Sequence, residues 1–212
     1  MFTHQPVMIN ETIKNLVHDP AGTYLDCTFG LGGHSKEILE NLNDDGRLIA
    51  IDRDKETALY SQKIEDKRFH FKNLNFSEIE SLNTRLDGIF FDLGNSSMQL
   101  DDPDRGFSFQ KDGPLDMRMN KEEEMTAEQW INTATEKEIS DVLFHLGEER
   151  KSRFYAKKIV ESRKKTKFKT TAQLSLFIEK YSSSQKRHPA TNVFRAIRMH
   201  INNEIEEMIN GF

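Results

Sequence analysis

The sequence predicts an α/β fold built on a doubly wound parallel sheet, and three observations support this class. Short apolar segments alternate with helical segments through the first ninety-odd residues. A glycine-rich turn follows the first apolar segment, and an aspartate ends the second. Beyond Leu93 the alternation stops, and a long helical region follows. Strands separated by helices in this rhythm pair in parallel, with helices on both faces of the sheet.

The four expected strands are short apolar runs. They lie at residues 24–28, 47–52, 69–72 and 87–92, and the helices between them are expected at residues 34–42, at residues 55–64 and, briefly, before the fourth strand. Four parallel strands leave an open edge of the sheet, which is available for pairing with further strands or with a second copy of the chain, such as in a dimer.

The second half of the chain predicts an insertion. Residues 94–119 are rich in Gly, Pro, Asp and Ser, and they are too long for a simple connection, so we expect a functional structureless loop. A last helix is expected at residues 191–209, returning to the sheet. The chain therefore divides into a sheet domain of residues 1–103 and 190–212, and an inserted loop and helical domain of residues 104–189.

Helix signals run through residues 126–181. Thr126, Thr135 and either Thr170 or Thr171 are expected N-caps, and Gly147 is an expected helix stop.

Composition indicates a water-soluble chain. Hydrophobic residues make up 36% and charged residues 31%, and no apolar run approaches the roughly 18 residues that span a bilayer. The start of the chain has neither the basic region nor the apolar stretch of a signal peptide. The single cysteine, Cys27, excludes an internal disulfide and fits a reducing compartment, so we expect the cytoplasm.

The charges are unevenly spread along the chain. The net charge is -5, yet residues 150–169 carry ten Lys and Arg against one acid, Glu161. A local basic face on an acidic protein can hold phosphates, although a solvated helix face has the same composition.

The turn Gly30-Leu31-Gly32-Gly33 indicates a site for a closely held ligand. Glycine admits close backbone approach, and the start of the following helix offers free N–H groups. Asp52 ends the next strand, where a carboxylate can accept hydrogen bonds from both hydroxyls of a ribose. Up to this point NAD and S-adenosylmethionine fit equally.

Two features favour S-adenosylmethionine. Ser35 stands where a dinucleotide motif needs its third glycine. Asp26 precedes the turn, and its carboxylate repels pyrophosphate but suits the ammonium group of a methionine moiety; capping of the strand end is its alternative role. No Walker-type lysine follows the glycines, which disfavours nucleoside triphosphate hydrolysis.

Three runs after the fourth strand carry a family resemblance. They read DLGNSSMQLD at residues 92–101, RGFSF at 105–109 and DGPLDMRM at 112–119. Together with TFG at 28–30, GGHS at 32–35, AIDRD at 50–54, GEER at 147–150, HPAT at 188–191 and His4 near the start, they resemble the ribosomal RNA small subunit cytosine-N4 methyltransferase family, also called MraW. The resemblance covers nearly the whole chain.

The resemblance implies a Rossmann-like class I S-adenosylmethionine methyltransferase sheet with an inserted all-helical domain that recognises RNA. It implies methylation of N4 of a cytidine in the decoding centre of small-subunit (16S-type) ribosomal RNA. Positions that match the family's cofactor contacts, with Asp26 and Gly30 added from the turn, are Asp26, Gly30, Gly32, Gly33, His34, Asp52, Phe76, Asp92 and Gln99. Phe76 fits a core aromatic equally well.

The exocyclic amine of cytosine is a poor nucleophile, because its lone pair is delocalised into the ring. Catalysis therefore needs positioning and hydrogen bonds more than a strong base. We expect Asp92 to accept from the amine or to position the cofactor, and Ser96 with Ser97 to hold the base edge. Asp116 and Arg118 are expected to close the site, and no catalytic metal is expected.

A base within structured RNA must be exposed before it reacts. Phe107 and Phe109 are expected to stack on bases. The residues expected to contact RNA through their positive charge are Arg105, Arg118, Arg150, Arg153, Lys157, Lys164, Lys165, Lys186 and Arg187.

Two departures from the family pattern keep other functions open. Asn95 replaces a small apolar residue, and the strands with which the family continues after the last helix, completing its sheet, are missing. The missing strands favour one alternative, a catalytically inactive fragment that binds the ribosome or its RNA. The other alternative is an NAD-dependent oxidoreductase, which Ser35 and Asp26 disfavour.

Overall fold

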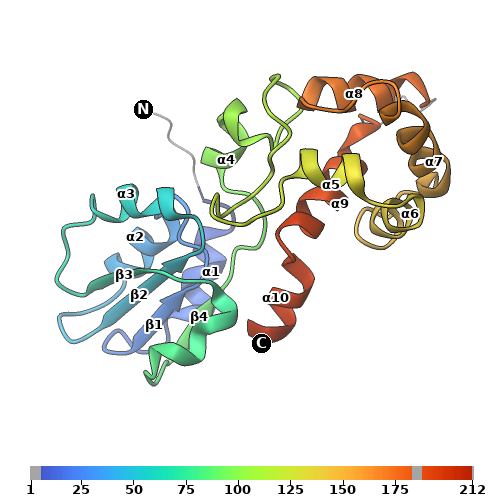
Figure 1. Cartoon of the computed structure of the whole chain (residues 1–212). Helices are drawn as coiled ribbons and strands as arrows, with labels where there is room; N and C mark the ends of the chain where they lie inside the picture. Colours follow the sequence, from blue (N-terminus) through green and yellow to red (C-terminus); the bar gives the residue numbers. More distant parts are fainter. Residues whose placement is uncertain (1–5, 183–187, 212) are drawn as a thin grey trace. The chain divides into compact units, whose positions relative to one another are not determined.

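The computed structural model describes residues 6–182 and 188–211 (Figure 1). The chain forms two compact units, one of residues 1–98 with 206–212 and one of residues 99–205. His4, Lys186 and Arg187, which the sequence singled out, lie outside the described residues. The assignment of cofactor binding to one domain and RNA recognition to the other stays a prediction.

The first unit is built on a four-stranded parallel sheet with the order β3-β2-β1-β4. The strands are β1 (Thr23–Asp26), β2 (Arg47–Asp52), β3 (Phe69–Asn73) and β4 (Gly88–Phe90). In the central strand, Leu25 lies opposite Ile49 on one side and Ile89 on the other. This sheet confirms the α/β class predicted from the sequence.

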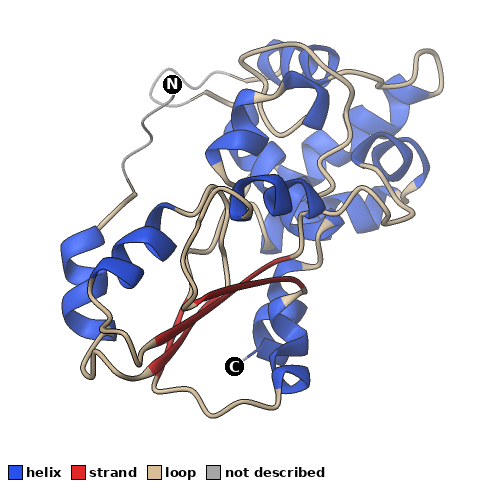
Figure 2. Cartoon of the chain, turned by 90° about the vertical axis from the view of Figure 1, so that its left-hand side faces the viewer, coloured by secondary structure: helices blue, strands red, loops and turns tan. Residues whose placement is uncertain are grey.

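Helices cover both faces of this sheet (Figure 2). They are α1 (Ile9–Leu16), α2 (Gly33–Glu40), α3 (Ala58–Ser61) and α10 (Glu204–Gly211), which begins in the second unit, with 3-10 turns η1 (Lys55–Thr57) and η2 (Phe76–Leu82). Successive side chains of a strand point to opposite faces. Tyr24 therefore packs in one cluster with residues of α1 and α2, whereas Leu25 packs in a second cluster with residues of η2.

The second unit is helical around one apolar core. Its elements are α4 (Ser97–Asp101), which begins in the first unit, η3 (Pro103–Arg105), α5 (Ala127–Thr133), α6 (Glu136–His145), α7 (Ser152–Arg163), α8 (Thr171–Lys180) and α9 (Ala190–Ile201). Capping boxes at Thr126, Thr135 and Thr170 confirm the predicted N-caps. A helix with the length and hydropathy needed to cross a bilayer does not occur in the described parts of the chain.

Two sequence-based expectations about elements were wrong, and one helix was not predicted. Residues 94–119 are not structureless, because they contain α4 and η3. Helix α1 was missed, although Ile9, Ile13 and Leu16 recur at helical spacing. The expected last helix at 191–209 is two helices, α9 and α10.

The break between α9 and α10 has a tertiary cause. The buried side chain of Asn202 donates from Nδ2 to the Met117 carbonyl at 2.7 Å and accepts from the Met119 N–H at 2.7 Å. Asn203 follows with φ of 50°, in the left-handed region where asparagine is tolerated best after glycine. Apolar periodicity continues through this point, so the sequence pattern does not reveal the break.

Candidate methyl-donor site

The carboxyl ends of the parallel strands meet at one edge of the sheet. From β1 the chain proceeds to β2 and β3 on one side, and β4 then pairs with the opposite side of β1. Open α/β sheets bind their ligands at such a reversal of strand order, outside the carboxyl ends. Asp26 and Asp52 end their strands there, and Asp92 follows β4 by two residues.

The turn after β1 depends on glycine. Gly30 and Gly32 have φ of 53° and 78°, which side-chain-bearing residues rarely adopt. A Cβ added to Gly32 would lie 2.8 Å from the Phe29 ring. Gly32 is also the N-cap of α2 and provides no side chain to cap the first-turn N–H groups. The start of α2 can therefore offer these groups to a ligand carboxylate.

Asp52 is joined to this turn by its carboxylate. Its Oδ2 accepts from the Gly30 N–H at 2.8 Å, and its Oδ1 accepts from the Asp54 N–H at 2.9 Å. Burial raises the pKa of Asp52 to about 6, and the two backbone hydrogen bonds oppose that rise. Each carboxylate oxygen can accept more than one hydrogen bond, so Asp52 retains capacity for ribose hydroxyls.

Asp26 lies behind the turn and is fully buried. Its Oδ2 accepts from Ser35 Oγ at 2.7 Å, and its Oδ1 accepts from the Thr28 N–H at 3.0 Å. Burial raises the pKa of Asp26, and the hydrogen bonds from Ser35 and Thr28 oppose this. The structure thus shows the capping role of Asp26, and contact with a ligand ammonium stays a prediction. Ser35 fastens α2 to β1 where a dinucleotide motif has glycine.

The backbone of Asp92 is held by a hydrogen bond, and its side chain is 54% exposed. Its N–H donates to Thr28 Oγ1 at 2.7 Å. His34 Nδ1 lies 3.8 Å from Asp92 Oδ2, and His34 Nε2 lies 3.0 Å from the Val7 carbonyl oxygen. Because a carbonyl only accepts, Nε2 carries the proton in that contact. Sequence reasoning missed Thr28 and Val7 in these roles, since no spacing signals a contact over such separations.

The remaining candidates of the first unit are near the turn or in the core. Ser96 Cβ lies 3.7 Å from the position a Gly30 Cβ would take, so Ser96 borders the turn. Ser97 is the first residue of α4. Phe76 packs edge-on against Phe91 with ring centroids 5.7 Å apart, which shows its core role. Its contact with adenine stays a prediction.

In the second unit, Asp116 and Arg118 bind each other. Arg118 Nε and Nη2 donate to the two oxygens of Asp116, each at 2.7 Å, and Nη1 donates to two backbone carbonyls. Burial alone would raise the pKa of Asp116, but the hydrogen bonds and charge of Arg118 outweigh it and lower that pKa. Gln99 is buried in the same unit. Participation of these three residues in the site stays a prediction.

The structure corrects two RNA contacts expected from the sequence. Arg105 is only 1% exposed, and its Nη2 donates to the carbonyls of Arg118 and Met119 at 3.1 and 2.9 Å. Phe107 is buried in the core of the second unit. A guanidinium that serves buried carbonyls and a ring inside the core do not reach RNA. Phe109 is half-buried and stacks on His188 with centroids 4.3 Å apart.

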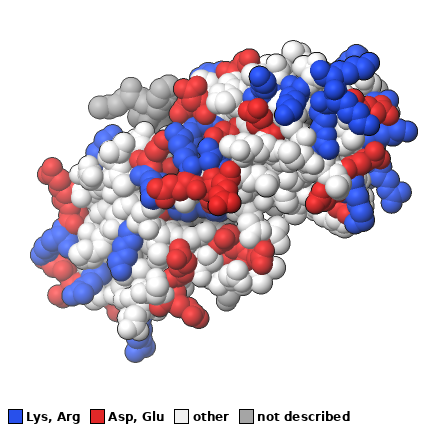
Figure 3. Space-filling view, viewed as in Figure 1, with Lys and Arg blue, Asp and Glu red and all other residues white. Residues whose placement is uncertain are grey.

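Most of the basic residues on and after α7 face solvent, as Figure 3 shows at its upper right. Arg163 differs, because it donates to the carbonyls of Ile131 and Ala134, and Lys158 is half-buried and pairs with Glu161 at 2.7 Å. The exposed residues, together with two that directly precede α7, are called the basic face, defined as Arg150, Lys151, Arg153, Lys157, Lys164, Lys165, Lys167 and Lys169.

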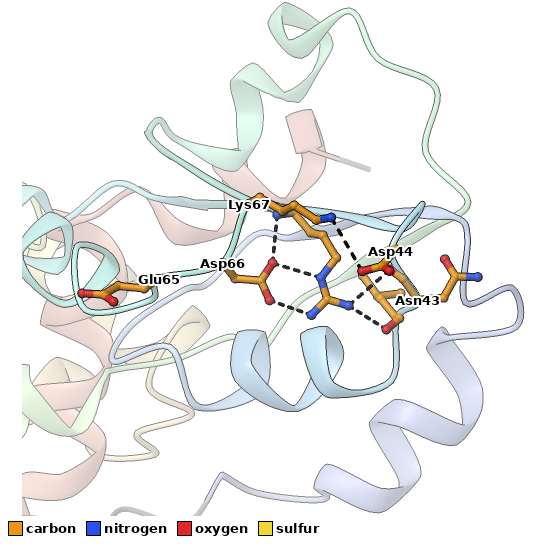
Figure 4. A pocket seen from close by; sticks show the side chains of 7 residues that line it. Asn43, Asp44, Glu65, Asp66 and Lys67 are labelled. Carbon is orange, nitrogen blue, oxygen red and sulfur yellow. Dashed lines mark hydrogen bonds and ion pairs between the residues drawn. The ribbon is translucent and has the colours of Figure 1, made fainter.

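An open pocket of about 530 Å³ lies at the opposite edge of the sheet (Figure 4). Its lining comes from residues 42–44 and 65–68, which precede β2 and β3. Arg68 donates from Nη1 to the Leu42 and Asn43 carbonyls and pairs with Asp66 at 2.6 Å. Arg68 therefore links the loop before β2 to the loop before β3, and its hydrogen bonds serve the protein's own groups. The described residues contain no group of three or more His, Cys, Asp or Glu arranged for a metal ion.

The fold and the site together define the class of protein. A parallel sheet with a glycine turn after β1, a carboxylate ending β2 and a polar loop after β4 is Rossmann-like, and Ser35, bonded to Asp26 where a dinucleotide motif has glycine, favours a methyltransferase domain. A sequence profile of the MraW methylase family matches residues 1–211, so the chain belongs to that family.

Curated relatives agree with this assignment. The chain is 46% identical to the ribosomal RNA small subunit methyltransferase H of Idiomarina loihiensis, over 97% of this chain and 68% of that protein. It is 44% identical to the proteins of the same name from Alcanivorax borkumensis and Fusobacterium nucleatum, over 98% of this chain and 69% of each relative.

Proposed function

We propose that the chain transfers a methyl group from S-adenosylmethionine to N4 of a cytidine in the decoding centre of small-subunit (16S-type) ribosomal RNA. The observation that carries this proposal is the convergence of Asp52 and Asp92 on the glycine turn. The Asp52 carboxylate accepts from the Gly30 N–H, and the Asp92 N–H donates to the hydroxyl of Thr28, which lies two residues before Gly30. Membership of a methylase family and the names of the relatives support the reaction and the RNA substrate. We expect it to act in the cytoplasm.

The donors and acceptors around the turn fit S-adenosylmethionine. Asp52 can accept from its ribose hydroxyls, and the uncapped start of α2 can donate to its carboxylate. Glycines at positions 30 and 32 let the ligand approach the backbone. When bound, the cofactor supplies an electrophilic methyl group on a positively charged sulfur.

Asp92 is the residue best placed to act on the base. Its carboxylate is exposed while its backbone is held at the end of β4. An Asp92 oxygen can accept a hydrogen bond from the N4 amine, which localises the nitrogen lone pair. Transfer of the methyl group to N4 would break its bond to sulfur and leave the electron pair of that bond on the sulfur. One N4 proton would then be acidic, and the same Asp92 oxygen could accept it. Ser96, beside the turn, can hold the edge of the base.

The basic face can bind the RNA backbone. Lys157, Lys164 and Lys165 are exposed on α7 and the turn that follows it. Each phosphate contact contributes a slope of about 0.7 to the log–log dependence of RNA affinity on salt for single strands. An RNA affinity that does not change with salt concentration would contradict this part of the proposal.

The experiment uses small ribosomal subunits that lack the modification. They are incubated with the chain and methyl-labelled S-adenosylmethionine, and the RNA is digested to nucleosides. Label in N4-methylcytidine supports the proposal. Label in another nucleoside contradicts the base assignment, and absence of label with cofactor binding retained favours an RNA-binding protein without activity. Binding of NAD in place of S-adenosylmethionine would favour an oxidoreductase.

A further inference from the structure

Helix α7 carries an exposed aromatic side chain within the basic face. Phe154 is 43% exposed, whereas its neighbour Tyr155 is buried. Lys151, the N-cap of α7, precedes Phe154 by three residues, and Lys157 follows it by three, so the two lysines flank Phe154 on the helix surface. A nucleic acid whose phosphates reach these lysines therefore passes beside the Phe154 ring.

The Phe154 ring is supported by other aromatic side chains. Its centroid lies 5.8 Å from that of Tyr181 at an interplanar angle of 76°, and Tyr181 packs against Phe177 at 5.1 Å. Lys180 Nζ lies 5.7 Å from the centroid of the Tyr181 ring and adds positive charge. The ring is thus held by neighbours and keeps part of its surface in solvent.

A second exposed aromatic residue shows why charge decides the interpretation. Phe144 on α6 is 54% exposed, which is more than Phe154. Asp141 precedes it by three residues on α6 and pairs with Lys137, and Glu148 follows the end of that helix and pairs with Arg195. These carboxylates neutralise the nearby cations, so the ring lacks the flanking positive charge that Phe154 has. Exposed single aromatics are common on protein surfaces. Of the two rings, Phe154 is the one that is both exposed and flanked by lysines that can bind the phosphates of single-stranded RNA.

We infer that Phe154 is a stacking platform for an unpaired RNA base, with flanking phosphates held by Lys151 and Lys157. The inference rests on the proposed RNA substrate. Proteins that bind single strands combine a positive surface with aromatic rings, and bases stack on these rings. Phe154 thereby takes the role that the sequence assigned to Phe107, which is in the core.

The direct test is the variant Phe154→Trp. Trp130, the natural tryptophan, is buried, so the new indole is the one a base can reach. Titration with a 12-nucleotide oligouridylate should quench the new fluorescence. An abasic ribose-phosphate oligomer of equal length should not quench it, and Phe144→Trp should respond to neither. Equal quenching of the two variants, or by the two oligomers, would overturn the inference.

The variant Phe154→Ala provides the affinity measurement. Oligouridylate binding, followed by fluorescence anisotropy, should weaken about 5- to 100-fold with the salt dependence unchanged, because stacking releases no counterions. Phe144→Ala should bind like the unaltered chain, and Phe154→Leu should weaken binding while preserving apolar packing. Phe154→Ala that binds like the unaltered chain overturns the stacking site, and the proposed reaction is judged separately by methyl transfer to small subunits. If the unaltered chain does not bind oligouridylate, the inference is overturned as well.

Discussion

Aspartates lie at both the carboxyl edge and the amino edge of the sheet, but the groups that donate hydrogen bonds to them differ. At the carboxyl edge, Asp52 accepts from backbone N–H groups and Asp26 from a backbone N–H and a serine hydroxyl. At the amino edge, Asp66 binds the Arg68 guanidinium, whose hydrogen bonds hold the pKa of Asp66 down at about 2. Neutral donors leave a carboxylate its negative charge, whereas a guanidinium neutralises it. The carboxyl edge therefore suits a positively charged ligand, and the amino edge serves to join two connections.

The largest expected effect comes from removing the exposed carboxylate of the carboxyl edge. Asp92→Ala should lower methyl transfer by at least about 100-fold, because the N4 amine loses its acceptor. The backbone bond to Thr28 is retained, so circular dichroism should be unchanged. Asp45→Ala, an exposed aspartate in the turn before β2, is the matched control and should keep full activity. Equal turnover in the two variants would remove Asp92 from the mechanism.

The second effect is a pH dependence at Asp52. Since burial raises its pKa to about 6, the carboxylate becomes protonated as the pH falls through 6. Affinity for S-adenosylmethionine should fall between pH 7 and pH 5 by calorimetry, and Asp52→Asn should bind about 10-fold more weakly with little change over this range.

As the pH falls, protonation of Asp52 should stabilise the folded protein, whereas it weakens cofactor binding. The folded protein takes up a proton near pH 6, and the unfolded chain only near the ordinary value of 3.8. The free energy of unfolding should therefore rise relative to Asp52→Asn as the pH falls from 6 towards 4. A fall over that window would contradict a raised pKa.

A smaller effect is expected at Ser35, which donates to the buried Asp26. Ser35→Ala leaves this carboxylate short of a donor and should lower the free energy of unfolding by about 1–3 kcal/mol. Ser61→Ala is the control, because its hydroxyl donates to a neutral carbonyl of its own helix. Urea denaturation of both variants would compare them, and equal losses would show that the Asp26 carboxyl is no stronger a partner than a backbone carbonyl.

The smallest effect is expected at the amino edge. Arg68→Ala should cost about 1–2 kcal/mol of stability at pH 7 and leave cofactor affinity unchanged. The lowered pKa of Asp66 places its stabilising contribution above the ordinary value of 3.8, and this is lost as the pH falls towards 2. The difference in melting temperature between the two proteins should therefore shrink below pH 4. A loss of cofactor affinity in Arg68→Ala would show that the two edges are not independent.

Features with a local cause were predictable from the sequence. The apolar runs indicated the strands, and the glycines with Asp52 indicated the edge where they converge. Arg105 was misjudged because an arginine looks the same in a sequence whether it faces solvent or serves buried carbonyls. Thr28, Val7 and Asn202 were missed because their partners lie 27 or more residues away. Such contacts exist only after the chain has folded.

The contacts that fix the glycine turn also bear on the order in which the chain is made. The Val7 carbonyl, the Asp52 carboxylate and the Asp92 N–H all precede residue 99, where the helical unit begins. Synthesis proceeds at roughly 5–20 residues per second, so residues 99–205 take roughly another 5–20 seconds to appear. These three partners of the turn have thus been translated before the basic face exists, and α10 joins the first unit last.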